Sequence, residues 1–287
     1  MIDWPDELVN DLVSQRAVLF IGSGVSRNSR GNDGRQPKGW HDFLVHAANS
    51  LNMTNEVEPY LGRRDYLTAL DLIRNKMTRD QYSRLVTEEY LEPQYEDAPI
   101  HHHLYRIGAN IVLSPNFDAI YDIYSRHKSR GTVLVKQYYD DGLARYIRGD
   151  QRVVIKIHGS VDSPEHMVFG RKDYAEARVK HSWFYDILRS LILTHTFIFI
   201  GCGTDDPDIR LLLEDVHFSA GHAREHYFVA ANDAIDAGLK TILHESMNLR
   251  VLEYNVDSST LSHADLTESL RQLAETVEVK RPVSPIV

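Results

Sequence analysis

Short runs of apolar residues recur along the whole chain and are separated by segments long enough to form helices. Seven of these runs have the length and composition of buried strands. They span residues 17–21, 110–113, 133–138, 153–157, 196–200, 227–230 and 250–254. Because such strands alternate with helix-length segments, the pattern predicts an α/β fold whose parallel sheet is covered by helices on both faces.

A helical region is predicted between the first two strands. Residues 41–90 are rich in Leu, Ala, Tyr and Arg, and Pro59 is their one proline. We expect an inserted helical region over about residues 41–95, with Pro59 at a helix start or in a connection and Pro99 in the first turn of the next helix. The tyrosines and arginines of residues 60–90 are interpreted as the faces of amphipathic helices. With this insertion, residues 1–287 are predicted to form a single domain.

Composition and charge argue against several classes of protein. The formal net charge is -9 and no stretch is dense in Lys and Arg, so direct binding to nucleic acid is not expected. The single cysteine, Cys202, cannot build a disulfide framework within the chain or a four-thiolate zinc site. The start of the chain lacks the pattern of a signal peptide, and no apolar run has the length of a membrane span. We therefore expect a soluble cytoplasmic protein that does not enter a membrane.

Two turns built of small residues follow predicted strands. They consist of Gly22, Ser23 and Gly24 after the first strand and of Gly201, Cys202, Gly203 and Thr204 after the fifth. Small residues in such turns allow backbone amides to approach a pyrophosphate. The first turn has Arg27 where the fingerprint of hydride-transferring dehydrogenases requires a third glycine, which disfavours that class. A tight turn without ligand, or helix capping after the second turn, remains the alternative.

Polar side chains follow two further strands. Asn116 and Asp118 come after the second strand, at the sheet edge where doubly wound folds bind ligands. The alternative for Asn116 is an Asx-type turn beside Pro115. His158 follows the fourth strand and precedes a glycine, so it is placed to accept a proton near neutral pH, although a lone histidine is more often structural.

Two other polar segments are candidates for a functional role. Residues 27–38 form a long polar loop beside the first glycine turn, and loops of that length more often have a function than serve only as a connection. His101, His102 and His103 are adjacent on a predicted helix and therefore point in different directions. No metal site is expected from these histidines.

Taken in order, these motifs resemble the sirtuin-like superfamily over nearly the whole chain. Residues 19–26, which end at Ser26, are similar to its first glycine motif, and Pro37 with Trp40 resembles the residues that close its cofactor loop. Residues 99–104 with Asn116 and Asp118 resemble its helix and Asn-x-Asp motif. Residues 156–160 and 199–210 resemble its His-Gly motif and its late glycine pattern. The resemblance implies a Rossmann-like, doubly wound parallel sheet that binds NAD.

Two departures from the deacylases of that family affect the expected activity. Those enzymes carry a cysteine-rich zinc module after the His-Gly motif, whereas this chain has Cys202 alone. Pro115 also stands where their Asn-x-Asp motif is preceded by Gln. Both departures disfavour lysine deacylation and favour the bacterial branch without a zinc module, whose members hydrolyse NAD, often in antiphage defence.

The resemblance also implies a set of site residues and partners. Asn116 positions the ribose and water, His158 is the base, and Asp118 organises the pocket. NAD, the substrate, is expected to contact Gly22, Ser23, Gly24, Ser26, Asn116, Asp118, Gly201, Gly203 and Thr204. In NAD the nicotinamide is already cationic and therefore a good leaving group, so no metal is expected. A homo-oligomer controlled by a separate sensor or ATPase protein is also implied, with residues 27–38 ordered over NAD by assembly.

Two other classes of function stay open. The fold is compatible with NAD-dependent transfer of ADP-ribose or removal of an acyl group from a protein. It is also compatible with a sensor that binds NAD or ADP-ribose without catalysis, although such a sensor does not need the base His158.

Overall fold

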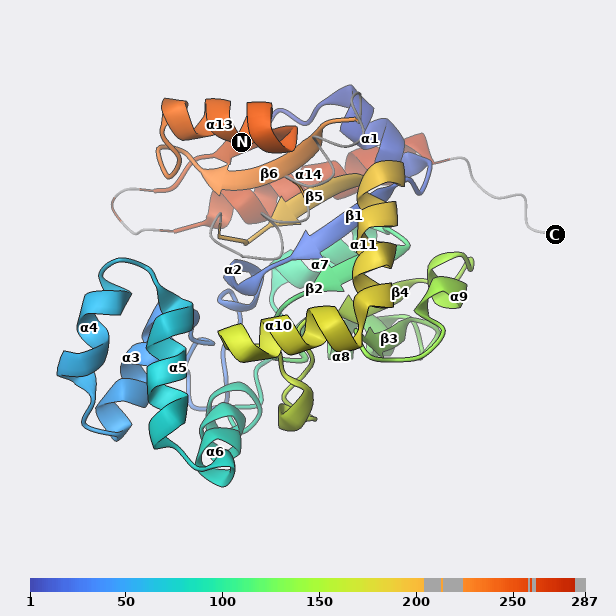
Figure 1. The fold of residues 1–287 in the computed structure, drawn as a ribbon. Helices are drawn as coiled ribbons and strands as arrows, with labels where there is room; N and C mark the ends of the chain where they lie inside the picture. Colours follow the sequence, from blue (N-terminus) through green and yellow to red (C-terminus); the bar gives the residue numbers. More distant parts are fainter. Residues whose placement is uncertain (204–212, 214–223, 258, 260–261, 282–287) are drawn as a thin grey trace.

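A parallel sheet forms the centre of the molecule. The computed structural model describes residues 1–203, 213, 224–257, 259 and 262–281 (Figure 1). These include the strands β1 (Ala17–Ile21), β2 (Ile111–Ser114), β3 (Leu134–Gln137), β4 (Val153–Lys156), β5 (Thr196–Ile200), β6 (His226–Ala231) and β7 (Leu249–Tyr254). All neighbouring pairs in the order β3-β4-β2-β1-β5-β6-β7 are parallel. The predicted α/β fold with a parallel sheet is confirmed.

The order of the strands places a switch point beside β1. Every residue of β1 and of β5 is buried, as their uninterrupted apolar sequences require in a sheet covered on both faces. From β1 the chain passes to β2 on one side, and it later returns to β5 on the other side. In doubly wound sheets, ligands bind beyond the carboxyl ends of the strands at such a point.

Helices cover both faces of the sheet (Figure 1). One face packs against α1 (Asp6–Val13), α7 (Pro99–Ile107), α8 (Ile120–Lys128) and α14 (Ala264–Lys280). The other packs against α9 (Leu143–Ile147), α10 (Arg171–Lys180), α11 (Ser182–Thr194) and α13 (Ala237–Met247). Side chains of β1 alternate between the two, with Leu19 in the first core and Val18 and Phe20 in the second.

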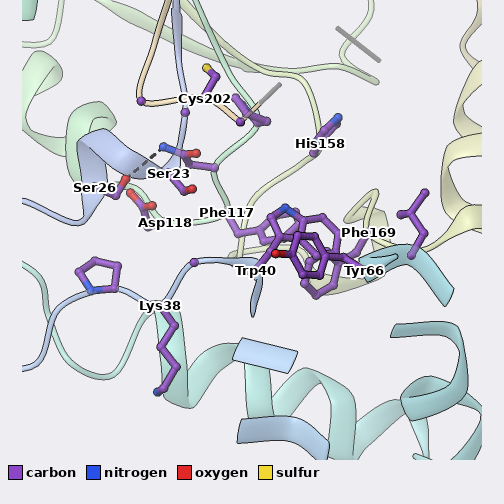
Figure 2. Close-up of a pocket in the computed structure, with 18 of the residues that line it drawn as sticks. Ser23, Ser26, Lys38, Trp40, Tyr66, Phe117, Asp118, His158, Phe169 and Cys202 are labelled. Atoms are coloured by element: carbon purple, nitrogen blue, oxygen red, sulfur yellow. Dashed lines mark hydrogen bonds between the residues drawn. The ribbon is translucent and has the colours of Figure 1, made fainter. Parts of the chain in front are cut away.

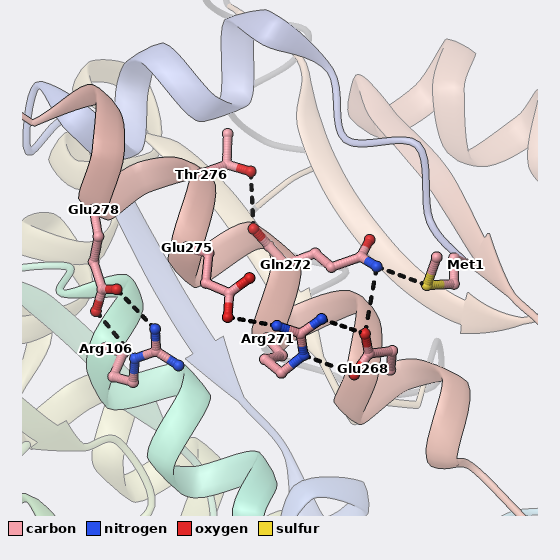
Figure 3. A network of polar contacts seen from close by, with 8 residues as sticks. All are labelled: Met1, Arg106, Glu268, Arg271, Gln272, Glu275, Thr276 and Glu278. Atoms are coloured by element: carbon pink, nitrogen blue, oxygen red, sulfur yellow. Dashed lines mark hydrogen bonds and ion pairs between the residues drawn. The ribbon is translucent and has the colours of Figure 1, made fainter.

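The two ends of the described chain meet on the first face. The backbone N–H of Ile2 donates to Ser269 Oγ in α14 at 3.0 Å. Figure 3 shows Arg106 of α7 bonded to Glu278 of α14, with nitrogen–oxygen distances of 3.0 and 2.7 Å. Because these charges are exposed, the buried apolar contacts between α14 and the sheet contribute most of the stability here.

The inserted helices lie beyond the carboxyl edge of β1 (Figure 1). After the short α2 (Ser23–Ser26) and the polar loop come α3 (Trp40–Ser50), α4 (Thr54–Leu61), α5 (Tyr66–Lys76) and α6 (Arg79–Tyr90). Their core includes Phe43, Leu70 and Val86, together with Phe117 and Phe169 from segments that follow sheet strands. We call α3 to α6 the helical layer, and this layer therefore shares a core with the edge of the sheet.

The structure confirms the prediction for one proline of this region and contradicts the prediction for the other. Pro99 is the first residue of α7, as predicted. The prediction for Pro59 is wrong, because it lies inside α4. Pro59 and Asn55, the residue four positions earlier, are both exposed, so water can take the place of the helical N–H that proline lacks.

The polar loop of residues 27–38 is held by bonds within the chain. The N–H of Asn32 donates to the carbonyl of Pro93 at 2.9 Å, and Arg30 forms an antiparallel bridge with Glu96. At the end of the loop, the N–H of Lys38 donates to Glu89 Oε1 at 2.9 Å. The loop thus has anchors at both ends, and its ordering by assembly stays a prediction.

In the part of the chain that the structure describes, no helix combines the length and the apolar character needed to cross a membrane.

Candidate functional site

A cavity of about 660 Å³ lies between the carboxyl ends of the strands and the helical layer (Figure 2). One side, which we call the sheet wall, consists of residues in turns after strands: Gly22, Ser23, Ser26, Pro115, Asn116, Phe117, Asp118, His158, Gly201, Cys202 and Gly203. The other side, the helical wall, consists of Pro37, Lys38, Gly39, Trp40, Arg63, Arg64, Asp65, Tyr66, Leu67 and Tyr90. Phe169, Arg171 and Tyr174, from the start of α10 and the segment before it, complete the lining.

The two glycine turns pack directly on each other. The N–H of Gly24 donates to the carbonyl of Gly201 at 2.9 Å. A Cβ at Gly22 would lie 2.4 Å from the oxygen of Gly201, and a Cβ at Gly24 would lie 2.9 Å from its Cα. The close approach of two backbones therefore accounts for both glycines, whether or not a ligand is bound.

Most of the predicted contacts with NAD line this cavity. Gly24 differs, because its described role is to pack against Gly201 behind the lining. Thr204 lies outside the described residues. The assignment of the remaining residues to NAD stays a prediction, although the structure brings them to one place.

Asn116 is held at the cavity by two hydrogen bonds. Its Nδ2 donates to Ser26 Oγ at 3.1 Å, and its backbone N–H donates to Ser114 Oγ at 3.3 Å. Ser26 is buried, whereas Asn116 is half-buried on the sheet wall. Figure 2 shows the bond to Ser26 at the end of α2. The orientation of the amide is thus set by a residue from another strand's turn.

Asp118 shapes the turn after β2. Its Oδ1 accepts the N–H of Ile120 at 3.1 Å, so the Asx-type turn bond considered for Asn116 belongs to Asp118. The side chain of Asp118 is also buried. This contact starts α8 and fixes the direction in which the chain leaves the cavity.

A buried ion pair lies next to this turn. Lys156 is only 1% exposed, and its Nζ donates to the backbone carbonyl of Asp118 at 2.5 Å. The same Nζ lies 3.0 Å from Asp122 Oδ2. Burial raises the pKa of Asp122 above its usual range, against the opposing effect of the Lys156 charge. The sequence interpretation gave neither residue a role of its own, although a lysine ending an apolar strand is a signal for a buried partner.

His158 lies at the cavity after β4. It is 3% exposed, and its ring meets the ring of Tyr174 edge-on with centroids 5.1 Å apart. Gly159 has φ +81°, and a Cβ there would lie 2.7 Å from the carbonyl of His166. The glycine of the His-Gly motif is therefore required by the sharp backbone turn that leaves His158 facing the cavity.

Aromatic rings join the two walls. Figure 2 shows Trp40, Tyr66, Phe117 and Phe169 gathered together. The Phe169 ring centroid lies 4.3 Å from that of Trp40 and 4.8 Å from that of Phe117. Trp40 and Tyr66 are nearly parallel, with centroids 6.3 Å apart. This group gives the cavity an apolar side to complement the polar residues of the sheet wall.

The connection between α4 and α5 also faces the cavity. Arg171 Nη2 donates to Asp65 Oδ1 at 2.8 Å, which links the start of α10 to the start of α5. Arg63, Arg64 and Tyr66 line the cavity beside this contact. The interpretation of these residues as faces of amphipathic helices is wrong for Arg63 and Arg64, which lie in the turn between α4 and α5. Tyr66 is the first residue of α5, and helical periodicity does not reveal that this end of the helix faces the cavity.

The adjacent histidines of α7 have separate surroundings. His101 Nδ1 accepts the N–H of Ala98 at 3.0 Å, whereas His102 Nε2 lies 2.5 Å from Asp97 Oδ2. Over the described ranges, no group of three or more His, Cys, Asp or Glu side chains is arranged to hold a metal ion.

A known family model matches the part of the chain that carries most of the sheet wall. The family model described as the SIR2-like domain matches residues 110–252. The chain therefore contains a SIR2-like domain. The matched residues carry Asn116, Asp118, His158 and Gly201, while the first glycine turn precedes the match. The predicted resemblance to the sirtuin-like superfamily is confirmed.

Several named proteins are similar in sequence to this chain. The NAD(+) hydrolase ThsA of Acinetobacter baumannii (strain 532279) is 24% identical over 230 residues, which cover 78% of this chain and 44% of that protein. The NAD(+) hydrolase ThsA of Cytobacillus dafuensis is 23% identical, covering 77% and 42%. Defense-associated sirtuin 2 of Bacillus subtilis is 20% identical, covering 86% and 24%. The SIR2-like chain thus spans less than half the length of each of these relatives.

Proposed function

We propose that this chain hydrolyses NAD⁺ at the bond between nicotinamide and ribose, giving nicotinamide and ADP-ribose. The observation that carries the proposal is that Asn116, held by Ser26, and His158 line one cavity at the switch point of the sheet. A volume of about 660 Å³ is typical of ligand pockets. The names of the ThsA relatives support NAD as the substrate.

The chemistry requires positioning and one proton acceptor. When the bond between nicotinamide and ribose breaks, its electron pair goes to the nicotinamide nitrogen. Nicotinamide therefore leaves as a neutral molecule, and the ribose gains oxocarbenium character. Water then bonds to C1′ of the ribose and loses a proton. In our proposal His158 accepts that proton, and the Asn116 amide orients the ribose and the water.

The remaining predicted residues are assigned to binding. Gly22, Ser23, Gly201 and Gly203 line the cavity where the turns after β1 and β5 meet, so we assign the pyrophosphate to these turns. Ser26 and Asp118 act chiefly on the shape of the site, through the bonds that they make to Asn116 and Ile120.

Substitution of the two central residues tests the proposal. We expect Asn116→Ala and His158→Ala each to lower kcat for nicotinamide release by about 100-fold or more. The matched controls are Asn55→Ala on α4 and His127→Ala on α8, since both side chains are exposed and outside the cavity lining. Chromatography of the products measures the rates, and circular dichroism checks the fold. Near-normal rates in both folded cavity variants would contradict the roles proposed for Asn116 and His158.

A second arm of the assay addresses metal dependence. Because Cys202 is the only cysteine, a thiolate zinc module cannot form within the chain. We expect turnover to continue in excess EDTA and to be unchanged by added zinc. Activity that EDTA abolishes and zinc restores would show that the mechanism is wrong.

The same assay separates the other functions. ADP-ribose attached to protein would indicate transfer in place of hydrolysis, and loss of acyl groups from a peptide would indicate deacylation. Binding of NAD without release of nicotinamide would indicate a sensor.

We further propose that the chain is a cytoplasmic, NAD-depleting effector of antiphage defence. The name of the Bacillus subtilis relative supports a defence role. Uncontrolled hydrolysis of NAD would harm the cell, so we expect a homo-oligomer whose activity is released by a separate sensor or ATPase protein. Light scattering and turnover of the chain alone test this expectation. A monomer with full activity in the absence of any partner would contradict it.

A further inference from the structure

Three hydrogen bonds join the end of β2 and the turn after it to the end of β4 and the turn after it. The N–H of Ile157 donates to the carbonyl of Ser114, and the N–H of Val161 donates to the carbonyl of Phe117, both at 3.0 Å. The third runs from Lys156 Nζ to the carbonyl of Asp118. Two of the three involve backbone atoms alone. The third depends on the identity of one side chain.

That side chain is unusual for its surroundings. Lys156 ends a strand whose other residues are Val, Val and Ile, and all four positions are buried. A buried ammonium group is costly unless it is paired and hydrogen-bonded. An apolar residue would fill this position without that cost, but it would donate no hydrogen bond to Asp118.

The bond joins the two short segments that carry the residues assigned to the reaction. Asn116 is two residues before the carbonyl that accepts the bond, and His158 is two residues after the lysine that donates it. Asp122, on the first turn of α8, lies 3.0 Å from the same Nζ and directs it toward that carbonyl.

We propose that Lys156 is a positioning residue, which sets the spacing between Asn116 and His158 by holding the Asn116 turn against β4. The inference rests on the hydrolysis proposed above. Lys156 acts through the backbone of Asp118 and does not line the cavity. Small displacements of positioned groups lower rates strongly, because reacting atoms must be aligned within a fraction of an ångström.

The test uses two variants that separate positioning from stability. Lys156→Met alone leaves Asp122 buried without its partner and is expected to fold poorly. The double variant Lys156→Met/Asp122→Leu removes both charges, so we expect it to fold, but the carbonyl of Asp118 then lacks its donor. Asp122→Asn keeps Lys156, its bond to Asp118 and an oxygen that can accept from Nζ, so it serves as the matched control. Because it leaves the Lys156 charge without a counterion, circular dichroism and denaturant unfolding first establish that this variant is folded.

We expect the double variant to lose about 10-fold or more in kcat, with KM for NAD within about 3-fold of the wild type. Asp122→Asn should keep kcat within about 3-fold. A general loss of structure would change both constants in both variants. A folded double variant with wild-type kcat, or an equal loss in Asp122→Asn, would overturn the inference.

Hydrogen–deuterium exchange provides a readout that does not depend on activity. Amides of residues 116–120 should exchange faster in the double variant than in Asp122→Asn, while those of β5 and β6 should not change. Unchanged exchange at residues 116–120 would overturn the positioning role. If the wild type releases no nicotinamide, the proposed function fails, and this comparison still shows whether Lys156 holds the turn.

Discussion

The sheet wall of the cavity consists of turns that follow four strands, whereas the helical wall consists of loop residues and helix ends between residues 37 and 90. On the sheet wall each polar residue has its place because a strand ends just before it. Residues of the helical wall, such as Arg63 and Tyr66, reach the cavity only because the layer packs against that edge.

This difference suggests a division of roles. The sheet wall holds the groups assigned to the reaction, Asn116 and His158, within a rigid set of backbone bonds. The helical wall contributes aromatic and charged side chains that line the other side of the cavity. We expect substitutions of Asn116 and His158 to act mainly on kcat and those on the helical wall mainly on KM.

The largest effect is expected from removing the side chain that joins the two regions. Phe169 is 1% exposed, and its ring contacts those of Trp40 and Phe117. We expect Phe169→Ala to lower the free energy of unfolding by about 3–5 kcal/mol, because it leaves a cavity in the shared core. Denaturant unfolding measures this loss, with Phe169→Leu as the milder control. A loss below about 1 kcal/mol would show that the walls do not depend on one core.

The next largest effect is expected from His226, a buried histidine of the sheet whose protonation makes the stability depend on pH. His226 begins β6, and its Nδ1 accepts the N–H of Phe197 at 3.1 Å. Burial lowers the pKa of His226 from 6.5 to about 4. As pH falls below 6.5, the unfolded chain binds a proton here while the folded chain does not, so stability is lost until about pH 4. The shift corresponds to ~3 kcal/mol.

The pH dependence is isolated by a variant that does not titrate. His226→Asn keeps an acceptor for the N–H of Phe197 and should reduce the loss of stability between pH 7 and pH 4.5 by about 2–3 kcal/mol. Denaturant unfolding at several pH values gives the comparison. Because the two regions share a core, far-ultraviolet dichroism and tryptophan fluorescence should report one transition. Equal pH dependence in both proteins would mean that His226 is not buried in its neutral form.

Two glycines, one from each region, give the smallest effect. An added Cβ at Gly24 would lie 2.9 Å from the Cα of Gly201, whereas one at Gly62 in the helical layer would lie 3.5 Å from the carbonyl of Glu58. We expect Gly24→Ala to cost about 1–3 kcal/mol and Gly62→Ala to change stability by less than about 0.5 kcal/mol. Thermal unfolding compares the two. Equal costs would mean that the turns of the sheet wall are no more tightly packed than the helical layer.

The strands and the residues that follow them can be predicted from the order of the amino acids alone. Apolar runs are local signals, and the predicted strand ends lie within one residue of those in the structure. Because the carboxyl ends of parallel strands meet at one edge, Asn116 and His158 were expected near each other before any contact was known. The family resemblance supplied their roles, which stay predictions.

How these residues are held and enclosed depends on contacts between segments that are far apart in the chain. Ser26 bonds Asn116 across 90 positions of sequence, and Lys156 bonds Asp118 across 38. Neither pairing has a periodicity or spacing that marks it in the sequence. The helical wall likewise depends on which ends of α4 and α5 turn toward the sheet, and packing of Phe117 and Phe169 into the helical layer's core sets that orientation. Contacts between distant segments follow from the shape of the whole core, so they become visible only once the chain has folded.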